Sequence, residues 1–135
     1  MSQEPSKEIK AVVDSVLGAF NSKNSKLFND SFGGEVAIID GFAPFRWTGP
    51  NAQARWWAEA ERWGEELGVA SEHISVEKTL HCQVVGTRAY AVLSATLTIG
   101  LKKGESIIRP GILIYTLIKL GGEWKAELQT WGRLN

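Results

Sequence analysis

The chain has 135 residues, of which 44% are hydrophobic and 22% charged, and its formal net charge is zero. This length is typical of one domain with its own core, and the composition excludes a disordered chain. No Lys/Arg stripe is present, so we expect neither nucleic acid nor a membrane as a partner.

Cysteine and histidine are scarce, which limits the chemistry available. Cys82 is the only cysteine, so an internal disulfide is excluded and a reducing, cytoplasmic location is expected. His73 and His81 are the only histidines, and we expect no metal site and no cofactor. Residues 1–10 lack the apolar stretch of a secretory signal, and residues 111–120 are too few to span a bilayer, so a soluble protein is expected.

The first half of the chain predicts three helices. Apolar residues spaced by three and four between Ile9 and Phe20 predict an amphipathic helix, and Pro5 suits its first turn. A short helix is expected after Ser25. A third opens at residues 48–50, with Pro50 near its first turn, and ends at Gly68. The expected buried stripe of the third helix contains Trp56, Ala60, Trp63 and Leu67.

The remaining segments predict strands. A short strand covers residues 36–40, with a small one around 45–47, and no repeat or linker indicates a second domain. Helices on one side of a largely antiparallel sheet define an α+β class. The four long strands are expected at 72–84, 88–101, 106–120 and 123–134.

The turns between these strands predict which side chains share a face. A two-residue turn at 86–87 pairs Val84 with Ala89, a four-residue turn pairs Leu101 with Ser106, and a three-residue turn pairs Ile118 with Trp124. A two-residue turn at the last point would turn the final strand over. The predicted inner face includes Ile74, Ala91, Leu97, Ile112, Ile114, Ile118, Trp124, Ala126 and Leu128.

The opposite face is mixed, and it is more aromatic than a solvent-exposed sheet surface usually is. We expect it to be covered in a homodimer, because aromatic residues and arginine are typical of interfaces. The alternative is an exposed face with scattered aromatics. The predicted outer face includes His81, Tyr90, Val92, Arg109, Leu113, Tyr115, Leu117, Gln129, Trp131 and Arg133.

Two stretches carry a family resemblance. Residues 19–57, AFNSKNSKLFNDSFGGEVAIIDGFAPFRWTGPNAQARWW, and residues 121–131, GGEWKAELQTW, resemble the NTF2-like superfamily, which includes ketosteroid isomerases and SnoaL-like polyketide cyclases. The resemblance implies a cone-shaped fold, in which a curved mixed sheet packs on three helices around a small apolar pocket. This scaffold carries enzymes and binding modules alike, so it predicts fold better than activity.

Asp40 is the predicted catalytic residue. It ends the first strand nine residues before Gly49, and in this it resembles the general-base aspartate of ketosteroid isomerases. It shares a face with Val36 and Ile38, so we expect it to point inward, where burial raises a carboxyl pKa. Such a base removes a proton from carbon next to a carbonyl. The alternative is that Asp40 only caps amides of the turn at 41–45.

Other residues of the family's active sites have no counterpart. Val16 stands where ketosteroid isomerases place a tyrosine, and Leu113 or Ile114 where they place a protonated acid. Leu128 and Thr130 stand where SnoaL-like relatives often carry histidine. Steroid isomerisation is therefore not expected.

We predict a pocket for a small apolar molecule between the first and third helices and the sheet, with Asp40 as its polar group. Three functions remain open: an isomerase, cyclase or dehydratase; a non-catalytic carrier of an apolar ligand; or a protein-interaction module. The predicted lining residues are Val16, Phe20, Trp56, Trp57, Ile112, Leu128 and Thr130.

Overall fold

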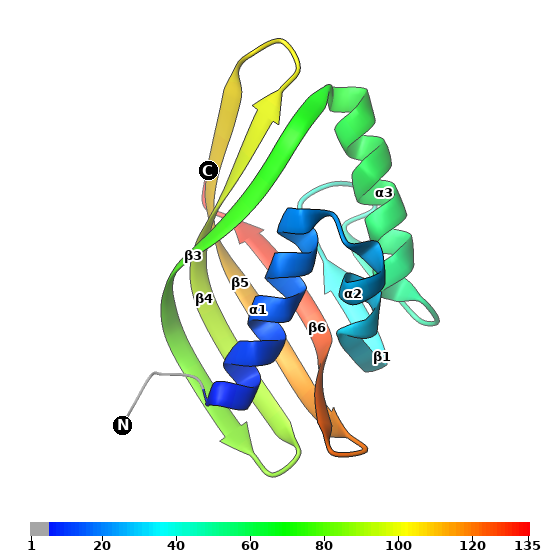
Figure 1. Cartoon of the computed structure of the whole chain (residues 1–135), viewed down its shortest axis with the longest axis vertical. Helices are drawn as coiled ribbons and strands as arrows, with labels where there is room; N and C mark the ends of the chain where they lie inside the picture. The colour runs from blue at the N-terminus through cyan, green and yellow to red at the C-terminus, as the bar shows by residue number, and fades with distance from the viewer. Residues whose placement is uncertain (1–5) are drawn as a thin grey trace.

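The computed structural model describes residues 6–135, and in it three helices cover one face of a curved six-stranded sheet (Figure 1). Pro5 lies outside the described residues. The helices are α1 (Lys7–Ser22), α2 (Ser25–Asp30) and α3 (Ala52–Leu67). The strands are β1 (Phe32–Ile39), β2 (Arg46–Thr48), β3 (Val69–Val85), β4 (Arg88–Leu101), β5 (Ser106–Leu120) and β6 (Glu123–Arg133).

Local signals set the helix ends. The Ser6 side chain accepts a hydrogen bond from the Ile9 amide at the start of α1. Gly68 ends α3 with a φ of 78°, a conformation that favours glycine, so this prediction is confirmed. Asn51 is the N-cap of α3, and Pro50 therefore precedes the helix instead of lying in its first turn.

The strand order is β2-β1-β6-β5-β4-β3, in which β1 and β6 run parallel and every other neighbouring pair runs antiparallel. The predicted α+β class, with a mixed sheet on three helices, is confirmed. The parallel pair places the end of β1 beside the second half of β6, since Ile39 is opposite Thr130. The residue that follows Ile39, Asp40, therefore lies beside the second half of β6.

The predicted register fails at the turn between β4 and β5. Gly100 is opposite Ser106, and the Leu101 amide donates to the Glu105 carbonyl, so the turn contains three residues and not four. Three-residue hairpin loops usually carry a glycine in the left-handed region, and Gly104 has a φ of 100°. Because side chains alternate along a strand, this one-residue difference turns β5 over. The inward residues of β5 are Ile107, Arg109, Gly111, Leu113, Tyr115 and Leu117.

The turn between β5 and β6 is also one residue shorter than predicted. Leu120 is opposite Glu123, so Gly121 and Gly122 alone form the turn. The two differences in turn length cancel for the first half of β6, so Ala126 is buried as predicted. The register then shifts between Thr116 and Leu117, because β6 carries one extra residue, Glu127, in a bulge. Beyond the bulge the inward residues are Gln129, Trp131 and Arg133.

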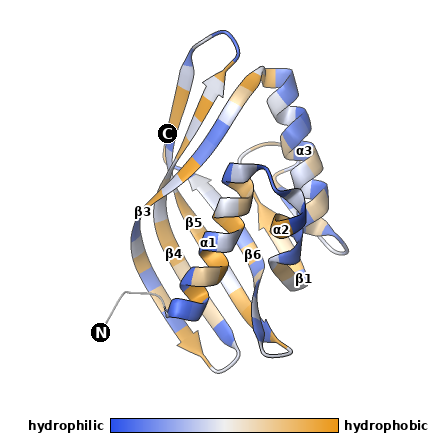
Figure 2. Cartoon of the chain, in the orientation of Figure 1, coloured by the Kyte–Doolittle hydropathy of each residue, from blue (hydrophilic) through white to orange (hydrophobic). Residues whose placement is uncertain are grey.

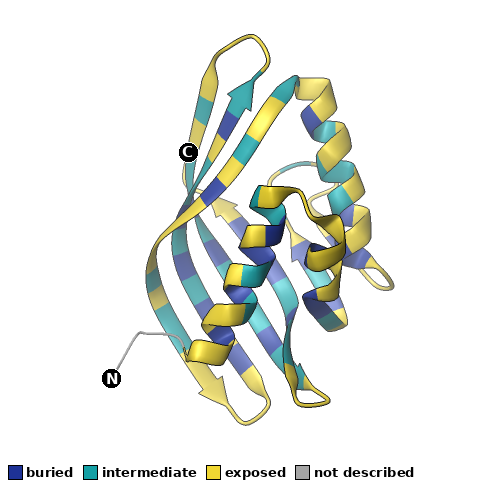
Figure 3. Cartoon of the chain, in the orientation of Figure 1, coloured by how far each residue is buried: buried dark blue, intermediate teal, exposed yellow. Residues whose placement is uncertain are grey.

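The core lies where α1 crosses the sheet. Orange and paler residues alternate along the strands in Figure 2, and the dark residues of Figure 3 gather beneath α1. Val16 and Ile38 are fully buried, and Tyr115 is the largest fully buried side chain. Among the helices of residues 6–135, none has the length and apolarity of a membrane span.

Candidate functional site

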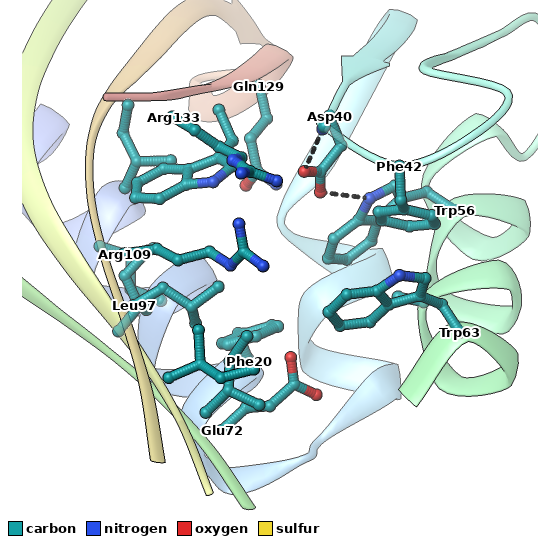
Figure 4. A pocket seen from close by; sticks show the side chains of 18 of the residues that line it. Phe20, Asp40, Phe42, Trp56, Trp63, Glu72, Leu97, Arg109, Gln129 and Arg133 are labelled. Carbon is teal, nitrogen blue, oxygen red and sulfur yellow. Dashed lines mark hydrogen bonds between the residues drawn. The ribbon is translucent and has the colours of Figure 1, made fainter. Parts of the chain in front are cut away.

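A cavity of about 300 Å³ lies between α1, α3, the loop after β1 and the inner face of β3 to β6 (Figure 4). This is the position predicted for the pocket. Aromatic side chains form much of one wall, and polar groups lie at intervals around it. Its lining includes Phe20, Asp40, Phe42, Trp56, Trp63, Glu72, Leu97, Arg109, Gln129, Trp131 and Arg133.

The loop that carries Asp40 is held at both ends. The Asp40 amide donates to the Phe45 carbonyl at 3.0 Å, and the Phe45 amide donates to the Phe42 carbonyl at 2.9 Å. The Phe42 ring stacks on Trp63 of α3 and lies against Trp47 of β2, with ring centres 5.7 and 5.2 Å apart. These contacts fix the loop against α3 and present Asp40 to the cavity.

The Asp40 carboxylate accepts two hydrogen bonds. The Gly41 amide donates to Oδ1 at 2.6 Å, and the Trp56 indole Nε1 donates to Oδ2 at 2.9 Å (Figure 4). Burial raises the pKa of Asp40, and it outweighs the two hydrogen bonds, which act in the opposite direction. The hydrogen bond from Gly41 matches the turn-capping alternative, and the same carboxylate is desolvated.

The predicted lining residues on the helices divide into two groups. Phe20 and Trp56 line the cavity as expected. Val16 is fully buried in the core, and the cavity does not reach it. Trp57 packs on Phe28, with ring centres 4.9 Å apart, and lines a separate hollow between α1 and α3. Successive helical residues point about 100° apart, so only one of two adjacent tryptophans faces the cavity.

The predicted lining residues on the strands lie on the wrong face of the sheet. Ile112 is opposite Gly132 and belongs to the outer face, because the short β4–β5 turn reverses β5. Leu128 is opposite Thr116, and Thr130 is opposite Ile114, so both also face outward. For these two, the cause is the bulge at Glu127, which shifts the alternation of β6 by one residue.

Together, the short β4–β5 turn and the bulge at Glu127 turn several residues that were predicted to face outward toward the site. The Tyr115 hydroxyl donates to Gln129 Oε1 at 2.8 Å, and both side chains are buried. Burial raises the pKa of Tyr115 far above its usual value, so the phenol stays protonated and remains a donor. Because Oε1 accepts this bond, the Gln129 amide nitrogen is the group left to face the cavity.

Charged groups lie at both ends of the cavity. Arg133 lies at the Asp40 end, and Glu72 lies at the other end, below Arg109 in Figure 4. Burial and, to a smaller extent, the charge of Asp40 raise the pKa of Glu72, while Lys23 lowers it. Within residues 6–135, no three His, Cys, Asp or Glu side chains form a metal-binding group.

One sequence signal could have revealed Arg109. Gly-Gly is a favoured two-residue hairpin turn, and Lys-Lys-Gly suits a three-residue turn that ends in a left-handed glycine. Choosing the three-residue turn would have turned Arg109 inward, but the two-residue turn alone would have left Gln129 and Arg133 facing outward. The bulge in β6 has no comparable signal in the sequence.

The sequence matches no protein-family model and no curated protein. Solved structures nevertheless superpose on nearly the whole chain. A candidate scytalone dehydratase from Novosphingobium aromaticivorans DSM 12444 is 14% identical, with a TM-score of 0.78 over 96% of this chain and 83% of that one. The hexachlorocyclohexane dehydrochlorinase LinA-type3 from Novosphingobium barchaimii LL02 is 9% identical, with a TM-score of 0.79 over 95% and 85%.

An NTF2-like protein of unknown function from Pseudomonas putida KT2440 is 14% identical, with a TM-score of 0.74 over 93% of this chain and 83% of that one. Identities this low carry no information about substrate or reaction, but the superpositions cover the three helices and the sheet together. The chain therefore has the NTF2-like fold.

Proposed function

We propose that the chain is a cytoplasmic enzyme of the isomerase, cyclase or dehydratase type, in which Asp40 is the general base. The observation that carries this proposal is the desolvated Asp40 carboxylate at the wall of an apolar, aromatic cavity. Each carboxylate oxygen accepts one hydrogen bond, which leaves a second lone pair on each for a substrate proton. The substrate is a small, largely apolar carbonyl compound.

The proposed step is a proton transfer from carbon. Asp40 takes the proton from the carbon next to the carbonyl group, and the electron pair of the C–H bond moves into the carbonyl to form an enolate. The enolate oxygen needs a hydrogen-bond donor, since such donors often supply the largest catalytic effect. The amide nitrogen of Gln129, oriented by Tyr115, fills this role.

The names of two structural neighbours are compatible with this chemistry. Loss of water by a dehydratase and loss of hydrogen chloride by a dehydrochlorinase both include removal of a proton. For this chain the parallel is a proposal only, because the neighbours share the fold and little sequence.

Hydrogen exchange tests the proposal without knowledge of the natural substrate. Small cyclic and aromatic ketones are incubated with the protein in D₂O, and loss of the proton next to the carbonyl is followed by NMR. We expect Asp40→Asn to slow the catalysed exchange by about 10²–10⁴-fold, the usual contribution of a general base. Asp14→Asn, which changes an exposed acid of α1, is the control. Exchange at the wild-type rate in Asp40→Asn would exclude Asp40 as the base.

A non-catalytic carrier of an apolar ligand is the second candidate. It is favoured by the absence of histidine from the cavity lining, since His73 and His81 lie elsewhere on β3. Native mass spectrometry of freshly purified protein tests it. A retained ligand together with absence of ketone exchange would favour the carrier, and an empty cavity in an active protein would exclude it.

We also propose a homodimer through the outer face of the sheet. On this face Tyr90 is 43% exposed and Ile39 is 40% exposed, and the isoleucines of β5 lie between them, only partly covered. Ile114→Lys places a charge at the centre of this face and should give a monomer in analytical ultracentrifugation. Leu27→Lys, on α2 at the helical side of the molecule, is the matched control. A monomeric wild type would contradict the dimer and leave this face free for another protein.

A further inference from the structure

We infer that the cavity binds a molecule with a carboxylate group, held by Arg109 and Arg133, on a flat apolar body. The inference deepens the proposed function by naming the substrate class of the same site. It rests on Arg109 and Arg133, which line the same cavity as Asp40 and were predicted to face outward.

The two arginines come from neighbouring strands and share one face of the sheet. Arg133 of β6 is opposite Gly111 of β5, and Arg109 lies two residues from Gly111 on the same side. The stem of Arg133 packs over the loop after β1, because a Cβ at Gly41 would lie 3.2 Å from Arg133 Cδ. In Figure 4 the Arg109 guanidinium points to the middle of the cavity, and Arg133 lies near Asp40.

The Arg109 guanidinium forms no ion pair within residues 6–135. The Arg109 side chain forms no hydrogen bond there either, and Arg133 donates only through Nε, to the backbone oxygen of Asn135 at 3.0 Å, which leaves its two Nη groups for a ligand. Elsewhere the fold does pair arginines, as Arg62 with Glu59 and Arg88 with Glu127. The half-buried Arg109 and the exposed Arg133 therefore both line the cavity with donors available to a ligand.

Guanidinium chemistry indicates the ligand. Arginine stays charged at all physiological pH values, and its planar fork matches a carboxylate with two parallel hydrogen bonds. A doubly charged phosphate fits less well, because Asp40 and Glu72 add negative charge to the same cavity. A singly charged carboxylate meets less of that repulsion.

The opposite wall indicates the rest of the molecule. Trp63 and Phe42 stack with their ring planes 27° apart, and both line the cavity with Trp56 (Figure 4). Flat aromatic walls favour a ring, and about 300 Å³ admits one or two fused rings. The predicted class is an aromatic or alicyclic carboxylic acid.

A pair of matched probes tests the inference on the wild-type protein. 2-Naphthoate and the neutral 2-naphthamide have nearly the same shape, and their dissociation constants are measured by calorimetry at pH 7.5. We expect wild type to bind the naphthoate at least about tenfold more tightly, the preference that one charged hydrogen bond supplies.

Variants then test whether Arg109 causes the preference for naphthoate over naphthamide. Arg109→Met should weaken naphthoate binding by about tenfold or more and change naphthamide binding by less than about twofold. Arg62→Met, on the outer side of α3, should change neither. Equal affinities of wild type for the two probes, equal losses for both in Arg109→Met, or no binding of either probe would overturn the inference.

The outcome is separable from the test of Asp40. Asp40→Asn should keep the preference for naphthoate, because it leaves both arginines in place. If that variant still exchanges ketone protons while wild type prefers the naphthoate, the general base is wrong and the carboxylate site stands. If Arg109 only offsets the charge of Asp40 and Glu72, Arg109→Met alters the pH profile of ketone exchange and changes the affinities for naphthoate and naphthamide by the same factor.

Discussion

Trp56 of α3 donates its indole hydrogen bond to Asp40 Oδ2 over 2.9 Å, which joins the third helix to the loop that ends β1. The same indole stacks on Phe28 of α2, with ring centres 5.2 Å apart and planes 25° apart. One side chain therefore fixes two helices and the proposed base at once. The position of the carboxylate depends on packing between α2 and α3 as well as on its own loop.

Replacing this indole should alter the titration of the carboxylate. Trp56→Phe keeps an aromatic ring against Phe28 and removes the donor that lowers the pKa of Asp40. The pKa should therefore rise further, and the acid limb of the pH profile for ketone exchange should move to higher pH. Trp57→Phe is the matched control, because Trp57 packs on the same Phe28 and does not contact Asp40. A profile that moves equally in both variants would contradict this role of Trp56.

The stability of the fold should depend on pH through Asp40. Its pKa is raised in the folded state, so between the unfolded and folded pKa values the folded chain binds more protons, and stability is lost as pH rises through that window. The free energy of unfolding of wild type, minus that of Asp40→Asn, should therefore increase as pH falls from neutral toward 4. Urea denaturation at several pH values measures this difference. A difference that does not change with pH would show that Asp40 titrates alike in both states.

The bond between Tyr115 and Gln129 should contribute to both stability and activity. Tyr115→Phe leaves Gln129 Oε1 buried without a donor, which should cost about 1–3 kcal/mol in urea denaturation. With Gln129→Leu, a double-mutant cycle should give a coupling of about 0.5–1.5 kcal/mol. Gln129→Leu should also slow ketone exchange by about 10²-fold or more, the loss expected of an oxyanion donor. A coupling near zero would mean that the two side chains act independently.

Gly111 should be intolerant of a side chain. A Cβ there would overlap the ring of Trp131, which is 9% exposed and lines the cavity. Gly111→Ala should destabilise the fold by about 1–3 kcal/mol, because Trp131 must move in a packed site. Gly132→Ala is the control on the neighbouring strand, where the nearest atom is 3.8 Å away, and it should be neutral or stabilising by about 0.4–1 kcal/mol. Equal thermal melting temperatures for the two variants would contradict the close packing.

The register of β5 shows why part of the site could not be predicted. Both faces of this strand are apolar, since Leu113 and Leu117 face inward and Ile112 and Ile114 face outward. Hydrophobic alternation therefore cannot choose between them, and the choice passes to the length of the β4–β5 turn. In β1 the inward face was predicted correctly from Val36 and Ile38, which are buried, and from Glu35, which is exposed.

The sequence by itself determined the order of the elements, the α+β class and the position of Asp40 at the end of β1, because helical spacing, turn residues and strand alternation act over a few residues. Tertiary structure alone decided that Gln129 and Arg133 face the cavity and that Leu128 and Thr130 do not. Side chains alternate with a period of two, so one residue more or less in a turn or bulge exchanges the two faces of every position that follows. The energy that fixes such a step comes from packing against residues far away in the chain, such as Tyr115 against Gln129 and Gly111 against Trp131.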